Sequence, residues 1–248
     1  MKQYFSPEQI KVVFFDINGT LMRTKKSGDE SFLAALNDFT GRWDHEEADW
    51  NPQEVLTQYK QELRTQQKIL SGHSKEEIQR ASLRQTLKPY PFAINDESVK
   101  AWISRIQNKR TSHCELLPHV QTTLSKLSGH YKLAVISNSS KASIISAFKL
   151  VGLDQLIPAE HICTSLKKKW KKPNTAIFRY AYKQMGVLPS QAIMVGNSWK
   201  NDIMGAAKAG MDAVWLRATP KKLSSLKRVG GRKIIIIKEF QELLELFK

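Results

Sequence analysis

The run Val12–Phe15 is followed directly by an aspartate, and this combination limits the folds that are open to the chain. Its four consecutive apolar residues are too few for an ordinary helix and show no polar alternation, which is typical of a strand buried on both faces of a parallel sheet. Asp16 then stands at the carboxyl end of that strand. Ligands of open α/β sheets bind outside the carboxyl ends of the strands, so we expect this carboxylate to have a chemical role.

Strand and helix signals alternate from residue 116 onward, which predicts βαβ units and a parallel sheet. Residues 11–21 supply a first strand of the same sheet. The sequence therefore predicts an α/β fold with a Rossmann-like core of at least five parallel strands. Further strands are expected at 132–136, 162–164, 192–195, 213–216 and 234–237, and helices at 120–127, 141–151, 174–185, 201–209 and 240–247.

The segment 22–112 carries helical signals and almost no strand signal. Asn51 and Ser74 are N-cap residues in favourable contexts, Asp96 begins a third helix, and residues 31–39 predict a fourth. We therefore expect an all-helical cap domain inserted into a core domain. The predicted boundaries are 22–112 for the cap and 1–21 with 113–248 for the core.

The formal net charge of +16 lies almost entirely in the second part of the chain. Residues 1–115 contain 17 basic and 16 acidic residues, whereas residues 116–248 contain 22 and 7. The electrostatic field of such an excess of positive charge favours an anionic partner, which predicts a small phosphorylated substrate. Nucleic acid is possible but not favoured, because the basic residues follow no recognition motif. The densest basic cluster, Lys167–Lys172, is equally consistent with a solvated loop.

Several classes of protein are disfavoured by composition. The longest apolar runs are far too short to span a bilayer, and the first residues lack the apolar stretch of a secretory signal. Cys114 and Cys163 have no CxxC spacing, so neither a disulfide framework nor a zinc site is indicated. We expect a cytoplasmic protein with no membrane partner, and the sequence gives no indication of an oligomeric state.

Polar residues stand where the expected strands end or the next helix begins. An aspartate can attack phosphorus directly and form an acyl phosphate, which water then hydrolyses. Such a reaction needs positive charge and hydrogen-bond donors at the phosphoryl oxygens. The carboxylates, hydroxyl, amides and cation that would meet around one crevice are Asp16, Ser137, Asn138, Lys172, Asn197 and Asp202.

Four segments resemble, in the correct order, the motifs of the haloacid dehalogenase-like (HAD) superfamily, which includes many phosphatases. They are FFDINGTL, VISNSS, KKPNTAIF and VGNSWKNDIMGA. The match covers residues 11–21 and about 116–218. The insertion after the first motif resembles the helical cap of the phosphoglycolate phosphatase and dehalogenase branch.

The resemblance implies a role for each matched residue. Asp16 would be the nucleophile, Asn18 stands at the usual acid/base position, and Lys172 would stabilise the intermediate. Gly19, Thr20, Ser137 and Asn138 would bind substrate or phosphate. The Mg²⁺ ligands would be Asp16, Asn18 through its backbone carbonyl, Asn197 and Asp202.

Two positions depart from the family pattern, because Asn18 and Asn197 replace aspartates. An amide cannot exchange protons as a carboxyl does, and general acid–base assistance typically supplies about 10²–10⁴-fold, so the predicted phosphatase would be slow unless water, the substrate or a cap residue takes over this role. Asn197 would weaken Mg²⁺ binding, since this ion prefers charged oxygens. Two alternatives stay open: a degenerate HAD domain that binds or regulates, and a metal-independent dehalogenase-type hydrolase.

Purely structural roles for single residues also stay open. Ser137 and Asn138 could form a turn or cap a helix, and Asp202 could be an ordinary acid in the first turn of a helix. Lys172 could be one more solvated lysine, with Lys171 as its competitor. Asp16 is the hardest residue to explain in this way.

Overall fold

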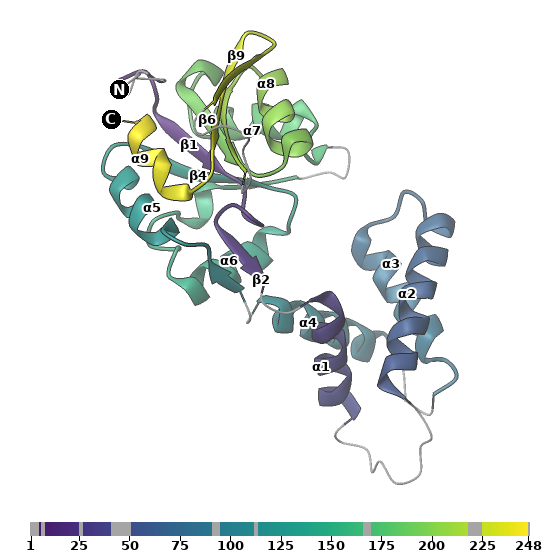
Figure 1. The fold of residues 1–248 in the computed structure, drawn as a ribbon. Helices are drawn as coiled ribbons and strands as arrows, with labels where there is room; N and C mark the ends of the chain where they lie inside the picture. The colour runs from purple at the N-terminus through teal and green to yellow at the C-terminus, as the bar shows by residue number, and fades with distance from the viewer. Residues whose placement is uncertain are drawn as a thin grey trace. The chain divides into compact units, whose positions relative to one another are not determined.

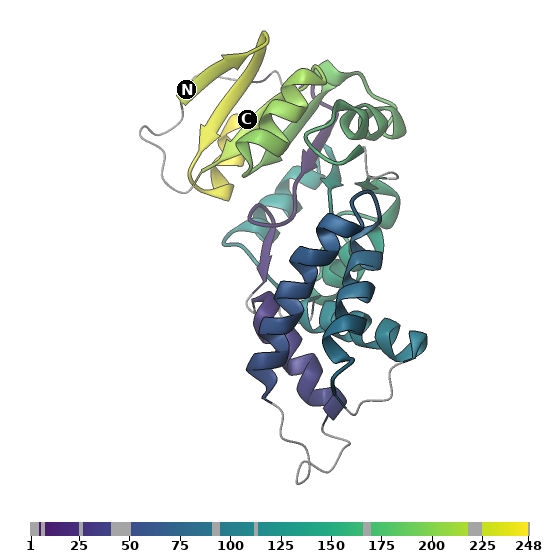
Figure 2. The same cartoon turned by 90° about the vertical axis from the view of Figure 1, so that its right-hand side faces the viewer.

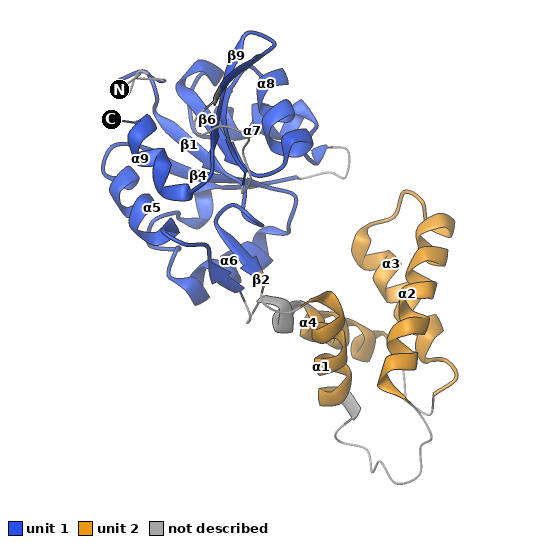
Figure 3. Ribbon diagram, viewed as in Figure 1, with its two compact units in different colours: residues 1–23, 114–248 blue, residues 24–113 orange. Residues whose placement is uncertain are grey.

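The computed structural model describes residues 5, 8–24, 27–40, 51–90, 95–111, 114–165, 170–217 and 225–247. The chain divides into two compact units (Figure 3). The first comprises residues 1–23 and 114–248, and the second comprises residues 24–113. The chain therefore leaves the first unit after its second strand and returns to it some ninety residues later.

A seven-stranded sheet forms the centre of the first unit (Figure 1). Its order is β5-β4-β1-β6-β7-β9-β8, and all neighbouring strands are parallel except β8 and β9. This arrangement confirms the predicted α/β class with a Rossmann-like parallel core. The strands are β1 (Val12–Phe15), β4 (Lys132–Ser137), β5 (Ile162–Thr164), β6 (Ala192–Gly196), β7 (Asp212–Leu216), β8 (Ser225–Val229) and β9 (Arg232–Ile237).

Strand β1 lies inside the sheet, between β4 and β6, and all four of its residues are buried. Val13 and Phe15 belong to the apolar core on one face, which includes residues of α5, α6 and α9. Val12 and Phe14 belong to the core on the other face, with residues of α7 and α8. Both faces are covered, which explains the uninterrupted apolar run. These helices are α5 (Val120–Ser128), α6 (Lys141–Val151), α7 (Thr175–Gln184), α8 (Met204–Lys208) and α9 (Leu243–Leu246).

The second unit is built from α1 (Gly28–Thr40), α2 (Pro52–Ile69), α3 (Lys75–Leu87) and α4 (Asp96–Thr111). Asn51 caps α2, and Ser74 with Glu77 forms the capping box of α3, as the sequence indicates. The unit has its own apolar core, in which the ring of Phe32 stacks on Tyr59 with centroids 4.6 Å apart. No helix in the described part of the chain is long and apolar enough to cross a membrane.

The structure differs from the sequence-based expectation at short or irregular elements. Strands β2 (Met22–Thr24) and β3 (Cys114–Leu116) pair with each other beside the junction of the two units, and neither has enough residues to show a period. Strand β8 was missed because its sequence, SLKRV, is that of a polar edge strand; Figure 2 shows it antiparallel to β9.

Two of the expected helices are less regular than their periodicity suggests. The helix expected at 201–209 is preceded by a π-helical turn, η5 (Trp199–Ile203), and only then continues as α8. The helix expected at 240–247 consists of a 3₁₀ turn, η6 (Phe240–Glu242), followed by α9. Two other 3₁₀ turns are η2 (Ala159–His161) and η4 (Pro189–Gln191).

Candidate active site

Asp16 continues the chain directly beyond β1, at the carboxyl edge of the sheet. Its backbone N–H donates to the carbonyl of Val195 in β6 at 2.9 Å, so the sheet ladder fixes its position. Its side chain is 13% exposed. Because β4 and β6 flank β1 in parallel, the residues that follow these two strands reach the same edge as Asp16.

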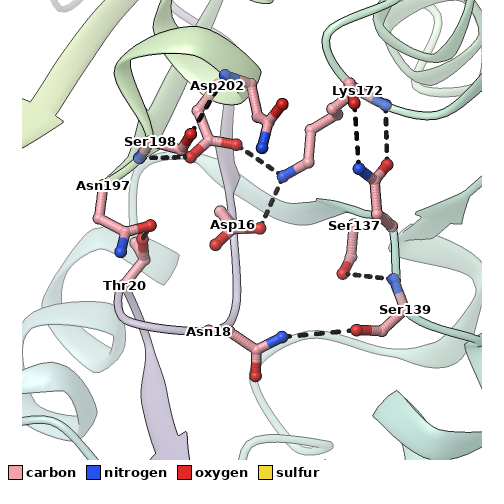
Figure 4. A network of polar contacts seen from close by, with 11 residues as sticks. Asp16, Asn18, Thr20, Ser137, Ser139, Lys172, Asn197, Ser198 and Asp202 are labelled. Carbon is pink, nitrogen blue, oxygen red and sulfur yellow. Dashed lines mark hydrogen bonds and ion pairs between the residues drawn. The ribbon is translucent and has the colours of Figure 1, made fainter. Parts of the chain in front are cut away.

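The Lys172 ammonium joins two carboxylates at this edge (Figure 4). Its Nζ donates to Asp16 Oδ1 at 2.6 Å and to Asp202 Oδ1 at 2.7 Å. The Lys172 side chain is 3% exposed, whereas Lys171 is exposed to solvent. The structure therefore brings Lys172, and not its neighbour, to Asp16. Residues 166–169, which include Lys167, Lys168 and Lys169 of the basic cluster, lie outside the described residues.

Asp202 lies in the π-helical turn η5 and is buried, with a side chain only 1% exposed. Its Oδ2 accepts from the backbone N–H of Ser198 at 2.9 Å. A Cβ at Gly196 would lie 2.5 Å from Asp202 atoms, so this approach requires glycine. Burial raises the pKa of Asp202, and the Asp16 carboxylate raises it further, while the Lys172 ammonium lowers it. The net result is a pKa of Asp202 above the usual range of an aspartate.

The amide of Asn138 pairs with the backbone of Lys172. Asn138 Oδ1 accepts from the Lys172 N–H at 2.7 Å, and Asn138 Nδ2 donates to the Lys172 carbonyl at 3.1 Å. These two bonds fix the loop that carries the ammonium. Ser137, at the end of β4, is buried, and its Oγ accepts from the backbone N–H of Ser139 at 3.2 Å. The Ser137 hydroxyl therefore keeps its own hydrogen for donation.

Asn18 is exposed and lies below Asp16 in the view of Figure 4. Its Nδ2 donates to Ser139 Oγ at 3.4 Å. The carboxamide is thus oriented across the edge of the sheet, from the loop after β1 to the loop after β4. The Asn18 amide can donate a hydrogen bond here, but it has no ionisable group that could act as a general acid.

Gly19, Thr20 and Asn197 form a packed group beside Asp16. Gly19 has a φ of +78°, and a Cβ at this residue would lie 2.3 Å from Asn197 Nδ2. Thr20 is buried, and its Oγ1 donates to Asn197 Oδ1 at 3.5 Å. On its other side, the Asn197 carbonyl accepts from Trp215 Nε1 at 2.9 Å. The loops after β1 and β6 are therefore in direct contact.

We expect Gly19→Ala to be markedly more destabilising than Gly152→Ala. Both glycines have a φ above +70°, but a Cβ at Gly152 would meet nothing within 4 Å. Strain at a positive φ costs about 1–2 kcal/mol, and the forced displacement of Asn197 should add about 1 kcal/mol or more at Gly19. Urea denaturation measures both variants. Equal free energies of unfolding would contradict the tight contact between Gly19 and Asn197.

The oxygen donors at the site have the chemistry that Mg²⁺ prefers. Figure 4 shows the carboxylates of Asp16 and Asp202 and the amide group of Asn197 at this edge of the sheet. Within the described ranges, no three His, Cys, Asp or Glu side chains gather as a metal cluster. Among the described residues of the site, two carry carboxylates, and Lys172 offsets one of their charges. The residues therefore fit a weakly held Mg²⁺.

Sequence reasoning missed two residues of this network. Ser139 receives the Asn18 amide, and no signal in its motif separates it from the neighbouring serines. Ser198 binds Asp202 through its N–H and caps η5 by accepting from the Asn201 N–H at 3.2 Å. A serine three residues before Asn201 is an N-cap signal that could have been found.

The fold and the site together define a protein of the α/β class with a Rossmann-like parallel sheet, which carries an aspartate, a lysine and a second aspartate at its carboxyl edge. Residues 13–216 match the model of the haloacid dehalogenase-like hydrolase family. The chain belongs to this family, and the predicted membership and hydrolase class are confirmed.

Relatives along most of the chain are named phosphatases. The glyceraldehyde 3-phosphate phosphatase of Methanothermobacter thermautotrophicus is 28% identical over 247 residues, which cover 96% of this chain and 99% of the relative. The human N-acylneuraminate-9-phosphatase is 21% identical over 229 residues, which cover 84% and 83%. A solved 2-haloacid dehalogenase from Pseudomonas syringae has the same fold, with a TM-score of 0.66, 23% identity and coverage of 96% and 97%.

Proposed function

We propose that the protein is a Mg²⁺-assisted phosphatase of a small phosphorylated metabolite, and that it acts through an aspartyl-phosphate on Asp16. The observation that carries this proposal is the contact of Lys172 with both Asp16 and Asp202 at the carboxyl edge of the sheet. The relatives named phosphatases support the reaction class. The positive charge of residues 116–248 supports an anionic substrate.

The chemistry begins with the Asp16 carboxylate. Lys172 holds Oδ1, which leaves Oδ2 on the side away from the ammonium (Figure 4). Oδ2 attacks phosphorus, the bond from phosphorus to the leaving oxygen breaks, and water later hydrolyses the acyl phosphate and restores the carboxylate. The Ser137 hydroxyl donates to a phosphoryl oxygen.

Lys172 and the predicted metal have separate tasks in this proposal. Lys172 orients the nucleophile and offsets the charge of the two carboxylates. A Mg²⁺ ion held by Asp16, Asp202, the Asn197 amide oxygen and the Asn18 carbonyl would offset negative charge on the phosphoryl oxygens. The insertion of residues 24–113 would serve as a cap that selects the substrate and excludes water.

A substrate panel with Mg²⁺ and with a chelator tests the function. It contains triose and sugar phosphates, 4-nitrophenyl phosphate and 2-haloacids. We expect phosphate release that needs Mg²⁺, and no halide release. Metal-independent halide release would favour the dehalogenase alternative. Saturable binding of phosphorylated compounds without turnover would favour a binding domain.

We expect Asn197→Asp to tighten Mg²⁺ binding on the order of tenfold, because it adds a negative charge among the proposed ligands. Asn201→Asp is the control, since it adds the same charge in the neighbouring turn η5, outside the proposed ligand set. Titration calorimetry with MgCl₂ alone measures both variants. An equal gain in the two variants would indicate only a general effect of charge and would contradict ligation by residue 197.

A further inference from the structure

The polar network around Asp16 contains few groups that can exchange a proton near neutral pH. Apart from the carboxylates and Lys172, its described members are amides and hydroxyls, which neither gain nor lose a proton in this range. They form hydrogen bonds but cannot act as general acids or bases. The members are Asn18, Thr20, Ser137, Asn138, Ser139, Asn197, Ser198 and Asn201.

The two titratable residues beside Asp16, Asp202 and Lys172, are both buried and form an ion pair with each other. Asp202 is 1% exposed, and its two oxygens accept from Lys172 and from the Ser198 N–H. Lys172 is 3% exposed and donates to both carboxylates. Both side chains are therefore buried and held in ion pairs. Asn18 and Asn197 are the exposed members of this network, and Asn18 stands two residues after Asp16, on the loop that follows β1.

We infer that this enzyme is selective for acyl phosphates and related compounds whose leaving group departs as a stable anion, because residue 18 cannot supply a proton. The inference rests on the proposed phosphatase function. Esters of simple alcohols need a proton on the departing oxygen, since an alkoxide is strongly basic. A carboxylate, with a pKa near 4, or an acidic phenolate needs none.

The atoms balance without a further reactant. Asp16 Oδ2 forms a bond to phosphorus as the bond from phosphorus to the leaving oxygen breaks, and the electron pair stays on that oxygen, which leaves as a carboxylate. Water then attacks phosphorus, the bond from Oδ2 to phosphorus breaks, and a proton of the water passes to solvent. The Asn18 amide stabilises the departing anion by donating a hydrogen bond.

A series of phenyl phosphates with leaving phenols of graded pKa tests the inference, with acetyl phosphate and glycerol phosphate as end members. We expect kcat/KM of the wild type to fall steeply as the leaving-group pKa rises. The Asn18→Asp variant should show a shallower dependence, with a gain of about 10²–10⁴-fold for the poorest leaving group and little gain for the best. Ser139→Ala removes the partner of Asn18 without adding an acid, so it should keep the steep slope.

The inference would be overturned if kcat/KM of the wild type depended on the leaving-group pKa as weakly as that of Asn18→Asp. Such a result would mean that another group supplies the proton. Steep slopes in both proteins would overturn the assignment to residue 18. Failure of the proposed function is distinguishable: no phosphate would be released from any member of the series, or the release would survive Asp16→Asn. Peptide mass spectrometry verifies that residue 18 is asparagine in the assayed protein, since an Asn-Gly sequence is prone to deamidation.

Discussion

Replacing Asp16 with asparagine is expected to lower kcat/KM for phosphate release by at least about 10³-fold. The variant keeps the shape of the side chain but removes the nucleophilic oxygen anion, and loss of a nucleophile is among the largest single effects in enzymes that form covalent intermediates. Lys172 keeps its bond to Asp202, so the fold should survive. Steady-state release from 4-nitrophenyl phosphate measures the effect.

Asp154→Asn is the matched control, because Asp154 follows α6 in the same unit and takes no part in the network of Figure 4. It should keep wild-type activity. A circular dichroism melt shows that both variants are folded. Activity of Asp16→Asn within a few-fold of the wild type would contradict the role of Asp16.

Lys172→Met is expected to abolish activity and to lower the free energy of unfolding by about 3 kcal/mol or more. It leaves two carboxylates facing one another without their cation, and breaking a buried pair in this way typically costs about 3–5 kcal/mol. Without Lys172, burial and mutual repulsion would hold the pKa of Asp202 above its value in the unfolded chain. The folded variant would then bind more protons than the unfolded chain.

This linkage gives the destabilisation a defined pH dependence. Stability of Lys172→Met relative to the wild type should decrease as pH rises through the carboxyl range, so the loss is largest near pH 7 and smaller near pH 4. Urea denaturation at both pH values measures it. Lys171→Met removes the same charge from an exposed position and should change stability by less than about 0.5 kcal/mol. An equal loss of free energy of unfolding in Lys172→Met and Lys171→Met would contradict the buried contact of Lys172 with the two carboxylates.

The sheet was predictable because its strands are buried on both faces. Such strands appear as short apolar runs, and β5 and α6 have the bounds that the sequence indicates. Strand β8 lies at an edge of the sheet, as β5 does, but it was not predictable in the same way because its sequence, SLKRV, contains few apolar residues. The three-residue strands β2 and β3 are too short to show a recognisable alternation of polar and apolar residues.

The site was predictable in its membership but not in its contacts. The order of the motifs places Asp16, Lys172 and Asp202 at one edge of the sheet. The sequence did not reveal that Lys172 bonds both carboxylates, or that Asn138 holds the Lys172 backbone, because these contacts join residues 30 to 156 positions apart. Whether Lys171 or Lys172 faces Asp16 likewise depends on tertiary packing.

The covalent step on Asp16 is the central claim of the proposed function, and trapping the intermediate tests it most directly. The enzyme is mixed with acetyl phosphate, quenched in acid within milliseconds and digested, and its peptides are analysed by mass spectrometry. We predict one phosphoryl group on the peptide that carries Asp16, absent from the Asp16→Asn variant. Turnover of acetyl phosphate without any phosphorylated peptide, or with the phosphoryl group on a different residue, would contradict the mechanism.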